Sequence, residues 1–273
     1  MSRIQKGDVK LADRSPAEFL KLLVLLSIPF WIAGYVVDRY LASASPINLP
    51  FSALMAINPL IVAFYLARRE SGRDASVRLL RSVFDWRKIS PTVWLAPILL
   101  TMPLVSLGSY GLMQAAGAAL PEPDFPWRLM PIFVPVFLLF AFAEEVGWQG
   151  YLMAPLQARW GALVGGVIVG LAWAVWHLIP YAQAGHGAGW IFWQCVTTVL
   201  SRVLIAWVCS NTGGSLLAAV LIHATINLCA FTFPNLGSHY DPYYASLALA
   251  VPVALVVIFW EPASLARRRR FRR

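Results

Sequence analysis

Long apolar runs, separated by short polar segments, follow one another along almost the whole chain. Each run is about 17–25 residues long, close to the ~20 residues that cross a ~30 Å hydrocarbon core as a helix. The pattern therefore predicts an all-α fold, a polytopic membrane helix bundle with about eight transmembrane helices. The eight runs cover approximately residues 19–37, 49–67, 92–115, 131–153, 162–180, 190–209, 215–233 and 244–260.

Composition agrees with this pattern, because 59% of the 273 residues are hydrophobic, more than in an ordinary soluble domain. The runs leave no room for a soluble domain, and we find no internal repeat or low-complexity linker. We therefore expect residues 1–273 to form a single integral membrane domain that ends in a basic tail at 261–273. The charged start has no cleavage site before the first run, which indicates a retained anchor rather than a signal peptide.

The formal net charge of +9 is concentrated in segments that would all lie on one side of a membrane. If both ends of the chain are inside, the inner segments hold 19 of the 22 Lys and Arg, and the outer loops hold only Arg39 and Arg128. Such an excess marks the cytoplasmic side. We predict a multi-pass protein of the cell membrane with both termini cytoplasmic, whose partner is the lipid bilayer and not nucleic acid.

Two adjacent glutamates, Glu144 and Glu145, follow a stretch without one polar side chain, residues 131–143. Ionisable groups at membrane depth are costly, so they usually mark chemistry or transport. Neighbouring helix positions point about 100° apart, so the two carboxylates cannot face the same point. Glu145 and Gln149, spaced i and i+4, are expected to share a face. One glutamate would then project into a reaction centre while the other is held by neighbours, the alternative being a purely structural pair.

Later apolar runs contribute two histidines and an asparagine. Trp173 precedes His177 by one helical turn, where an aromatic ring can exclude water and fix the imidazole. His223 and Asn227, at i and i+4, present an imidazole and a carboxamide to one spot, and an asparagine can stabilise a developing oxyanion. Taken singly, each of these residues could instead be a packing residue or a contact between helices.

Arg202 lies inside an apolar run, and an arginine at that depth needs a partner. We predict that it pairs with Glu145 or Glu144. The alternative is that its side chain reaches the membrane interface or lines a wet cavity.

Three stretches in order, EEVGWQGYL, LAWAVWHL and NTGGSL followed by HATIN, resemble the CPBP family, also called the Abi family. That family contains the CAAX prenyl endopeptidases and bacteriocin-processing intramembrane proteases. The resemblance covers a catalytic core at about residues 131–233. The family usually has arginine at the position of Gln149 and commonly phenylalanine at that of Trp173. The resemblance implies that four residues are catalytic: Glu144, His177, His223 and Asn227.

These features predict an intramembrane endopeptidase that hydrolyses a peptide bond of a membrane-associated or prenylated substrate. Glu144 would activate a water, and histidine and asparagine side chains would stabilise the oxyanion. The alternative is a non-catalytic membrane scaffold or regulator that keeps the protease fold, which the missing charge at Gln149 favours. A proton-coupled transporter is a weaker third interpretation. We expect supporting roles for Glu145, Gln149, Trp173 and Arg202.

The same residues bear on metal dependence and on the side of the membrane from which the site is reached. His177, His223 and Glu144 match a catalytic zinc ligand set in type, although Glu144 cannot easily be both ligand and base. At about 1.5 Å per residue, Glu144 lies about 20 Å from the outer end of its run and His223 about 12 Å from the inner end of its own. We therefore expect the site to open toward the cytoplasmic half. His177, about 22 Å from the inner end of its run, disagrees.

Overall fold

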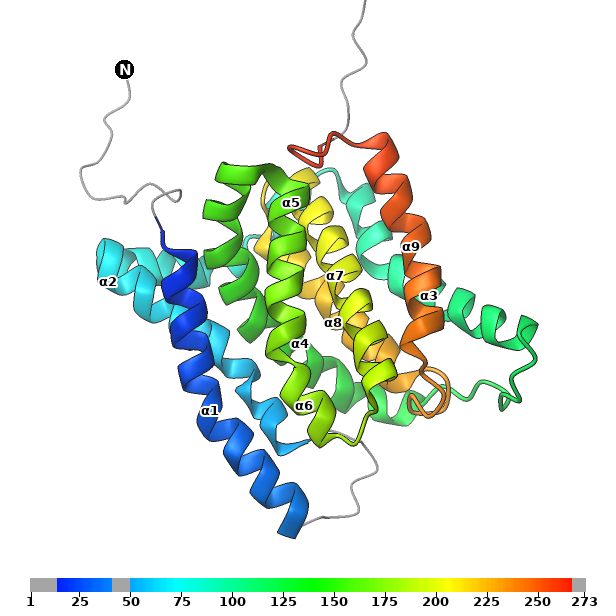
Figure 1. Cartoon of the computed structure of the whole chain (residues 1–273). Helices are drawn as coiled ribbons and strands as arrows, with labels where there is room; N and C mark the ends of the chain where they lie inside the picture. Colours follow the sequence, from blue (N-terminus) through cyan, green and yellow to red (C-terminus); the bar gives the residue numbers. More distant parts are fainter. Residues whose placement is uncertain (1–13, 41–49, 267–273) are drawn as a thin grey trace, which may run out of the picture.

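The computed structural model describes residues 14–40 and 50–266, and the elements in these ranges are helical (Figure 1). The basic start of the chain, residues 1–13, lies outside the described residues. So do residues 267–273, which make up most of the predicted basic tail at 261–273. The side chain of Arg39 is also outside the described part of the structure.

Each predicted apolar run overlaps one long helix, although the run at 49–67 covers a 3₁₀ segment at 51–57 and only the first part of the helix at 58–81. The runs are almost free of charged residues, so they can lie in an apolar environment. As helices they pair their backbone N–H and C=O groups within the segment. The long helices are α1 (Pro16–Tyr40), α2 (Asn58–Arg81), α3 (Leu95–Ala115), α4 (Met130–Gly147), α5 (Met153–Trp176), α7 (Ala188–Asn211), α8 (Leu216–Thr232) and α9 (Pro242–Phe259).

Short helical segments connect or extend the long helices. A π-helical turn, η7 (Trp148–Leu152), joins α4 to α5, and a short helix, α6 (Leu178–Gln183), follows α5. The 3₁₀ segments are η2 (Phe51–Ile57), η3 (Ser82–Phe84), η4 (Trp86–Lys88), η5 (Thr92–Trp94) and η6 (Trp127–Leu129).

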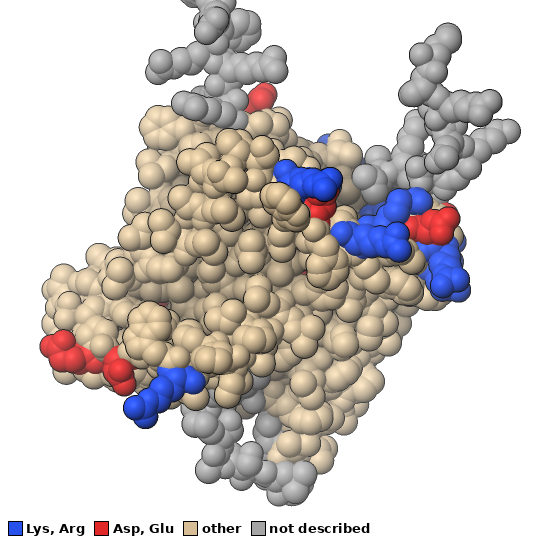
Figure 2. Space-filling model, turned by 180° about the vertical axis from the view of Figure 1, so that it is seen from behind, with Lys and Arg blue, Asp and Glu red and all other residues tan. Residues whose placement is uncertain are grey.

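The predicted membrane bundle is confirmed. Within residues 14–40 and 50–266, six continuous helical segments are long and apolar enough to cross a bilayer; one of them, Trp127–Gln183, contains both α4 and α5, and α8 is an apolar helix slightly shorter than the rest. Figure 2 shows charged side chains gathered toward the two ends of the molecule, with a broad uncharged band between them. The protein is therefore a multi-pass membrane protein.

The long helices run alternately up and down, so the connections fall at two opposite ends of the bundle (Figure 1). The first and last described residues lie at one end, which we call the terminal end. The opposite end, which we call the loop end, carries the connections at residues 177–187 and 233–241. This arrangement places both ends of the described chain at the same end of the bundle.

Helix α7 is central, since it packs against α5, α8 and α9. Its approach to α5 depends on Gly170, where a Cβ atom would come within 2.9 Å of Val199 Cα and 3.2 Å of Arg202 Cβ. Small residues allow membrane helices to approach this closely. Gly170 thereby brings the turn of α5 that carries Trp173 next to the turn of α7 that carries Arg202.

A break at Gly161 divides α5 into two helical parts. The backbone there has a φ of +80°, which glycine adopts without strain, and the Ala162 amide donates to the Ala263 carbonyl at 2.7 Å. The second helical part of α5 therefore begins at residue 162, the residue at which the apolar run was predicted to begin. His177 directly follows the last residue of α5 and lies at the loop end of the bundle.

Candidate active site

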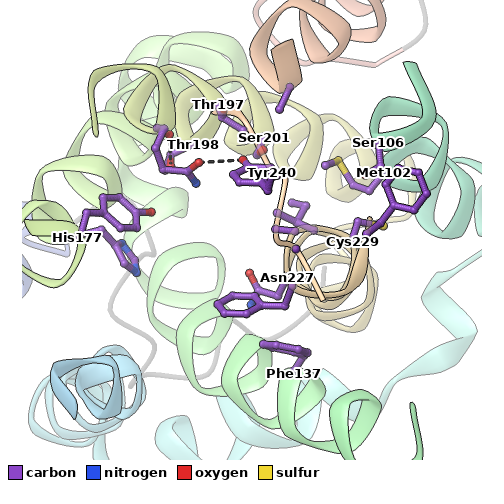
Figure 3. A pocket seen from close by; sticks show the side chains of 18 of the residues that line it. Met102, Ser106, Phe137, His177, Thr197, Thr198, Ser201, Asn227, Cys229 and Tyr240 are labelled. Atoms are coloured by element: carbon purple, nitrogen blue, oxygen red, sulfur yellow. Dashed lines mark hydrogen bonds between the residues drawn. The ribbon is translucent and has the colours of Figure 1, made fainter. Parts of the chain in front are cut away.

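A cavity of about 790 Å³ lies among α3, α4, α5, α7 and α8. The four residues predicted to be catalytic all line it: Glu144, His177, His223 and Asn227. Figure 3 shows His177, Ser201 and Asn227 arranged around this space from separate helices. The fold thus brings together side chains that lie up to about eighty positions apart in the sequence.

Glu144 sits near the end of α4, where the apolar stretch before it has crossed most of the bundle. Its side chain is buried, with 5% of its surface exposed. The indole Nε1 of Trp173 donates a hydrogen bond to Glu144 Oε2 at 2.7 Å. Within the described residues, the other oxygen, Oε1, has no hydrogen-bond donor from the protein, and Glu144 lines the cavity.

Glu145 faces away from the cavity, as the rotation of about 100° per residue requires. Arg202 Nη1 and Nη2 donate to its two carboxylate oxygens, each at 2.8 Å, and both side chains have no exposed surface. The predicted pairing of Arg202 with a glutamate is confirmed, and the partner is Glu145. The second glutamate is therefore held by its neighbours, while the first one projects into the cavity.

His223 connects this ion pair to the cavity. Its Nδ1 lies 2.7 Å from Glu145 Oε1. Because an ionised carboxylate only accepts, Nδ1 carries the hydrogen and the Nε2 atom is left for the cavity side. The carboxylate fixes both the tautomer and the ring orientation of His223, as is common for functional histidines.

His177 is fixed in a similar way by the backbone. Its Nδ1 lies 2.9 Å from the Trp173 carbonyl, and a carbonyl only accepts, so Nδ1 is the protonated nitrogen. The ring also packs on Tyr181, with ring centroids 5.5 Å apart and planes inclined by 22°. A neutral His177 therefore presents an unprotonated Nε2.

Asn227 lies one turn after His223 on α8 and is half-buried at the cavity wall. Ser215 caps the start of this helix by accepting a hydrogen bond from the Ala218 amide at 3.2 Å. The cap and the i, i+4 spacing place the imidazole and the carboxamide on one face, as predicted.

Gln149 is not part of this cavity. It lines a separate cavity of about 330 Å³ together with Cys209 and Gly214. The expected shared face with Glu145 assumed a continuous α-helix, but Gln149 belongs to the π-helical turn η7, whose wider turn changes the alignment. Gln149 Oε1 is buried without a hydrogen-bond partner among the described residues.

The zinc ligand set considered from the sequence does not form. Among the residues that the structure describes, no group of three His, Cys, Asp or Glu side chains is arranged to hold a metal ion. His223 is turned toward Glu145, and His177 toward the Trp173 carbonyl. We therefore derive no chemical step through a metal.

A polar face of α7 was missed in the sequence. Gln194, Thr198 and Ser201 line the cavity at helical spacing, and Tyr240 donates to Gln194 Oε1 at 2.8 Å. The i, i+4, i+7 spacing of polar residues in an apolar run was the available signal. Ser201 Oγ is buried without a hydrogen-bond partner in the described part of the chain.

The cavity reaches the surface at the loop end, where exposed Ser238 and His239 contribute to its lining. His186 also lies there, stacked on Trp190 with ring centroids 3.5 Å apart, and burial lowers the pKa of His186.

With cytoplasmic termini, the loop end would face outward, so the expected cytoplasmic opening is not compatible with the expected orientation of the termini. The depth of Glu144 does not decide access, because the terminal side of the site is filled by Trp148 and Arg202, both fully buried.

Comparison with known proteins gives two results. A family model described as type II CAAX prenyl endopeptidase Rce1-like matches residues 126–229. The chain is also 25% identical over 224 residues to CAAX prenyl protease 2 of Methanococcus maripaludis, an alignment that covers 77% of this chain and 81% of that protein. Both results agree with the resemblance carried by the three motifs, and the matched interval contains the four candidate residues that line the cavity.

Proposed function

We propose that this chain, which belongs to the CPBP family and is a CAAX-type intramembrane endopeptidase, cleaves its substrate with Glu144 as the general base. One observation carries the proposal. Glu144 is the carboxylate of the pair that faces the cavity, and His177, His223 and Asn227 line the same cavity. A base, two imidazoles and a carboxamide around one cavity are the groups that peptide hydrolysis needs.

Glu144 would take a proton from a water as that water attacks the substrate carbonyl carbon. Trp173 occupies Oε2, so the water would meet Oε1. The hydrogen-bond donor to Glu144 is the uncharged indole N–H group of Trp173. The donor to Glu145 is the guanidinium of Arg202, whose positive charge balances the carboxylate. This difference supports the assignment of the base to Glu144 and of a structural role to Glu145.

The oxyanion would be stabilised from α8. The Asn227 amide can donate to the oxygen, and the Nε2 atom of His223 can donate as well when the imidazole carries both protons. His177, with its unprotonated Nε2, would orient the attacking water. When the tetrahedral intermediate collapses, protonated Glu144 gives its proton to the leaving nitrogen, the C–N bond breaks, and a carboxylic acid and an amine result.

The substrate would be a membrane-embedded or lipidated peptide. One side of the cavity is apolar, with Met102, Phe137 and Cys229 in its lining, and the α7 side is polar. A peptide attached to an apolar segment or to a lipid chain likewise has a polar part, the peptide backbone, and an apolar part. The size of the cavity is within the range of ligand-binding pockets.

We also propose that both termini are cytoplasmic, because the basic residues between Arg68 and Lys88 and Arg159 lie at the terminal end. On this orientation, the cavity opens at the outer side, and the substrate enters from that side or from within the bilayer. Residues 1–273 would form one membrane domain.

The non-catalytic alternative loses its main support. It was favoured because Gln149 removes a positive charge beside the glutamates. Arg202 on α7 supplies a buried positive charge that pairs with Glu145, so this glutamate has a cationic partner without an arginine at position 149.

Cleavage of defined peptides by the purified protein in proteoliposomes tests the proposal. A prenylated peptide, an unmodified peptide and a transmembrane peptide are compared, and Glu144→Ala serves as the blank. We expect cleavage that the blank lacks and that a zinc chelator does not remove. Equal cleavage by Glu144→Ala, or none of the three peptides being cut by the wild type, would contradict it.

A further inference from the structure

We infer that Trp173 is a positioning residue whose indole N–H group holds Glu144 Oε2 and so directs Glu144 Oε1 at the attacking water. The inference rests on the proposed role of Glu144 as the base. Trp173 would not touch the reacting atoms; it acts through the carboxylate that does.

The contact itself is a short hydrogen bond between buried groups. Trp173 Nε1 lies 2.7 Å from Glu144 Oε2, and the two residues are 6% and 5% exposed. An indole N–H can only donate and a carboxylate can only accept, so the direction of the bond is fixed. No other protein donor reaches this carboxylate within the described residues. Trp173 therefore selects which oxygen of Glu144 remains free on the cavity side.

Trp173 is itself fixed by the buried ion pair. The Arg202 guanidinium carbon lies 4.6 Å from the centre of the indole ring, and the same guanidinium binds both oxygens of Glu145. A guanidinium over the face of a tryptophan is a favourable cation–π arrangement. The ring cannot turn without losing this contact, and Arg202 cannot move without breaking its two hydrogen bonds to Glu145.

The other contacts of the ring point to the same role. The indole meets the His223 ring edge to face, with centroids 4.8 Å apart and planes inclined by 71°. Trp173 thus contacts both the proposed base and the proposed oxyanion donor, while its own carbonyl orients His177. One side chain on α5 fixes the relative positions of groups carried by α4 and α8.

The chemical consequence is that the two glutamates have different hydrogen-bond partners and different proposed roles. Glu145 is neutralised directly by Arg202, whereas Glu144 receives only the neutral N–H group of Trp173. The positive charge of Arg202 therefore stabilises the position of Glu144 through the ring and does not bind its carboxylate. A phenylalanine ring would keep the aromatic contacts and lose only the donor.

The direct test is Trp173→Phe, with Trp207→Phe as the matched control. Trp207 is also a buried tryptophan, and its Nε1 has no hydrogen-bond partner among the described residues, so the control removes the same ring volume without removing a bond. We expect Trp173→Phe to lower kcat roughly 10- to 100-fold with KM almost unchanged, from the strength of a hydrogen bond to a charged group. Trp207→Phe should keep the wild-type kcat.

Three results would overturn the inference. They are a wild-type kcat in Trp173→Phe while Glu144→Gln is inactive, an equal loss of kcat in both tryptophan variants, and a loss confined to KM. Activity retained by Glu144→Gln would instead remove the proposed base, and the inference with it.

A second measurement does not depend on the folding of Trp173→Phe. The wild-type protein and Glu144→Ala are both labelled with ¹⁵N-tryptophan and their spectra are compared. Relative to the wild type, Glu144→Ala should shift one of the 12 indole N–H resonances far more than the others. Glu144→Gln, which keeps an acceptor oxygen, should shift it less. An unchanged set of resonances in Glu144→Ala would show that the hydrogen bond is not formed.

Discussion

Arg202 and Glu145 form a bidentate ion pair whose Nη1–Oε2 and Nη2–Oε1 distances are both 2.8 Å and whose side chains have no exposed surface. Removing one partner leaves a buried, unpaired charge, which costs about 3–5 kcal/mol. We expect Arg202→Leu and Glu145→Leu each to lower the free energy of unfolding by this order. Because the double variant leaves no orphan charge on this pair, it should be destabilised by clearly less than the sum. Chemical unfolding of all four proteins measures the coupling.

The chain offers a matched control for this cycle. Arg69 and Glu18 form a bidentate pair of the same type, at 2.7 and 2.6 Å, but their side chains are 44% and 37% exposed. Water screens such a pair, so the same cycle on Arg69 and Glu18 should give little coupling. Equal coupling in the two cycles would mean that burial is not what makes the Arg202–Glu145 pair important.

A second prediction concerns the oxyanion. Asn227→Ala should lower kcat by about 10²- to 10³-fold, the usual effect of removing one oxyanion donor, with a smaller change in KM. His223→Ala should cost more, because it removes a donor and also leaves Glu145 without one of its partners. Asn211→Ala is the control, since Asn211 binds the Trp207 and Leu265 carbonyls at the terminal end. An Asn227→Ala enzyme with wild-type kcat would exclude Asn227 from the oxyanion site.

The third prediction is the side from which the cavity is reached. In a variant without its three native cysteines, Ser238→Cys marks the mouth at the loop end and Asp74→Cys marks the terminal end. We expect a membrane-impermeant maleimide to label Ser238→Cys on intact cells and Asp74→Cys only after permeabilisation. The reverse pattern would show that the charge rule gives the wrong orientation here. Labelling of both positions from one side would contradict the alternating helix arrangement itself.

Some features follow directly from the free-energy cost of burying a charge or an unpaired backbone group, and these features were predictable from the sequence. Long uncharged runs in a membrane form helices, because their backbone groups must be paired internally. This rule predicted the helix bundle and agrees with the helical part that begins after Gly161. Arg202 and Glu145 were predicted to meet because each is too costly to bury alone. The i, i+4 spacing of His223 and Asn227 placed both on one face, since α8 is regular from Leu216 to Thr232.

Features that depend on how helices pack against one another were not predictable. The bond from Trp173 to Glu144 requires α4 and α5 to meet at one particular rotation, which no local pattern encodes. The π-helical turn placed Gln149 in another cavity, against the expectation from a regular helix. The opening at the loop end depends on which end the side chains fill, and the depth of one residue does not determine that.

The central claim is that Glu144 removes a proton from the attacking water, and the turnover of Glu144→Gln tests it most directly. Glutamine keeps the shape of the side chain and can still accept the Trp173 hydrogen bond, but it cannot take up the proton. In proteoliposomes, with the amount of folded protein matched by its unfolding transition, we predict that peptide cleavage by Glu144→Gln falls at least about 10²-fold below the wild type. Cleavage at the wild-type rate would contradict the account.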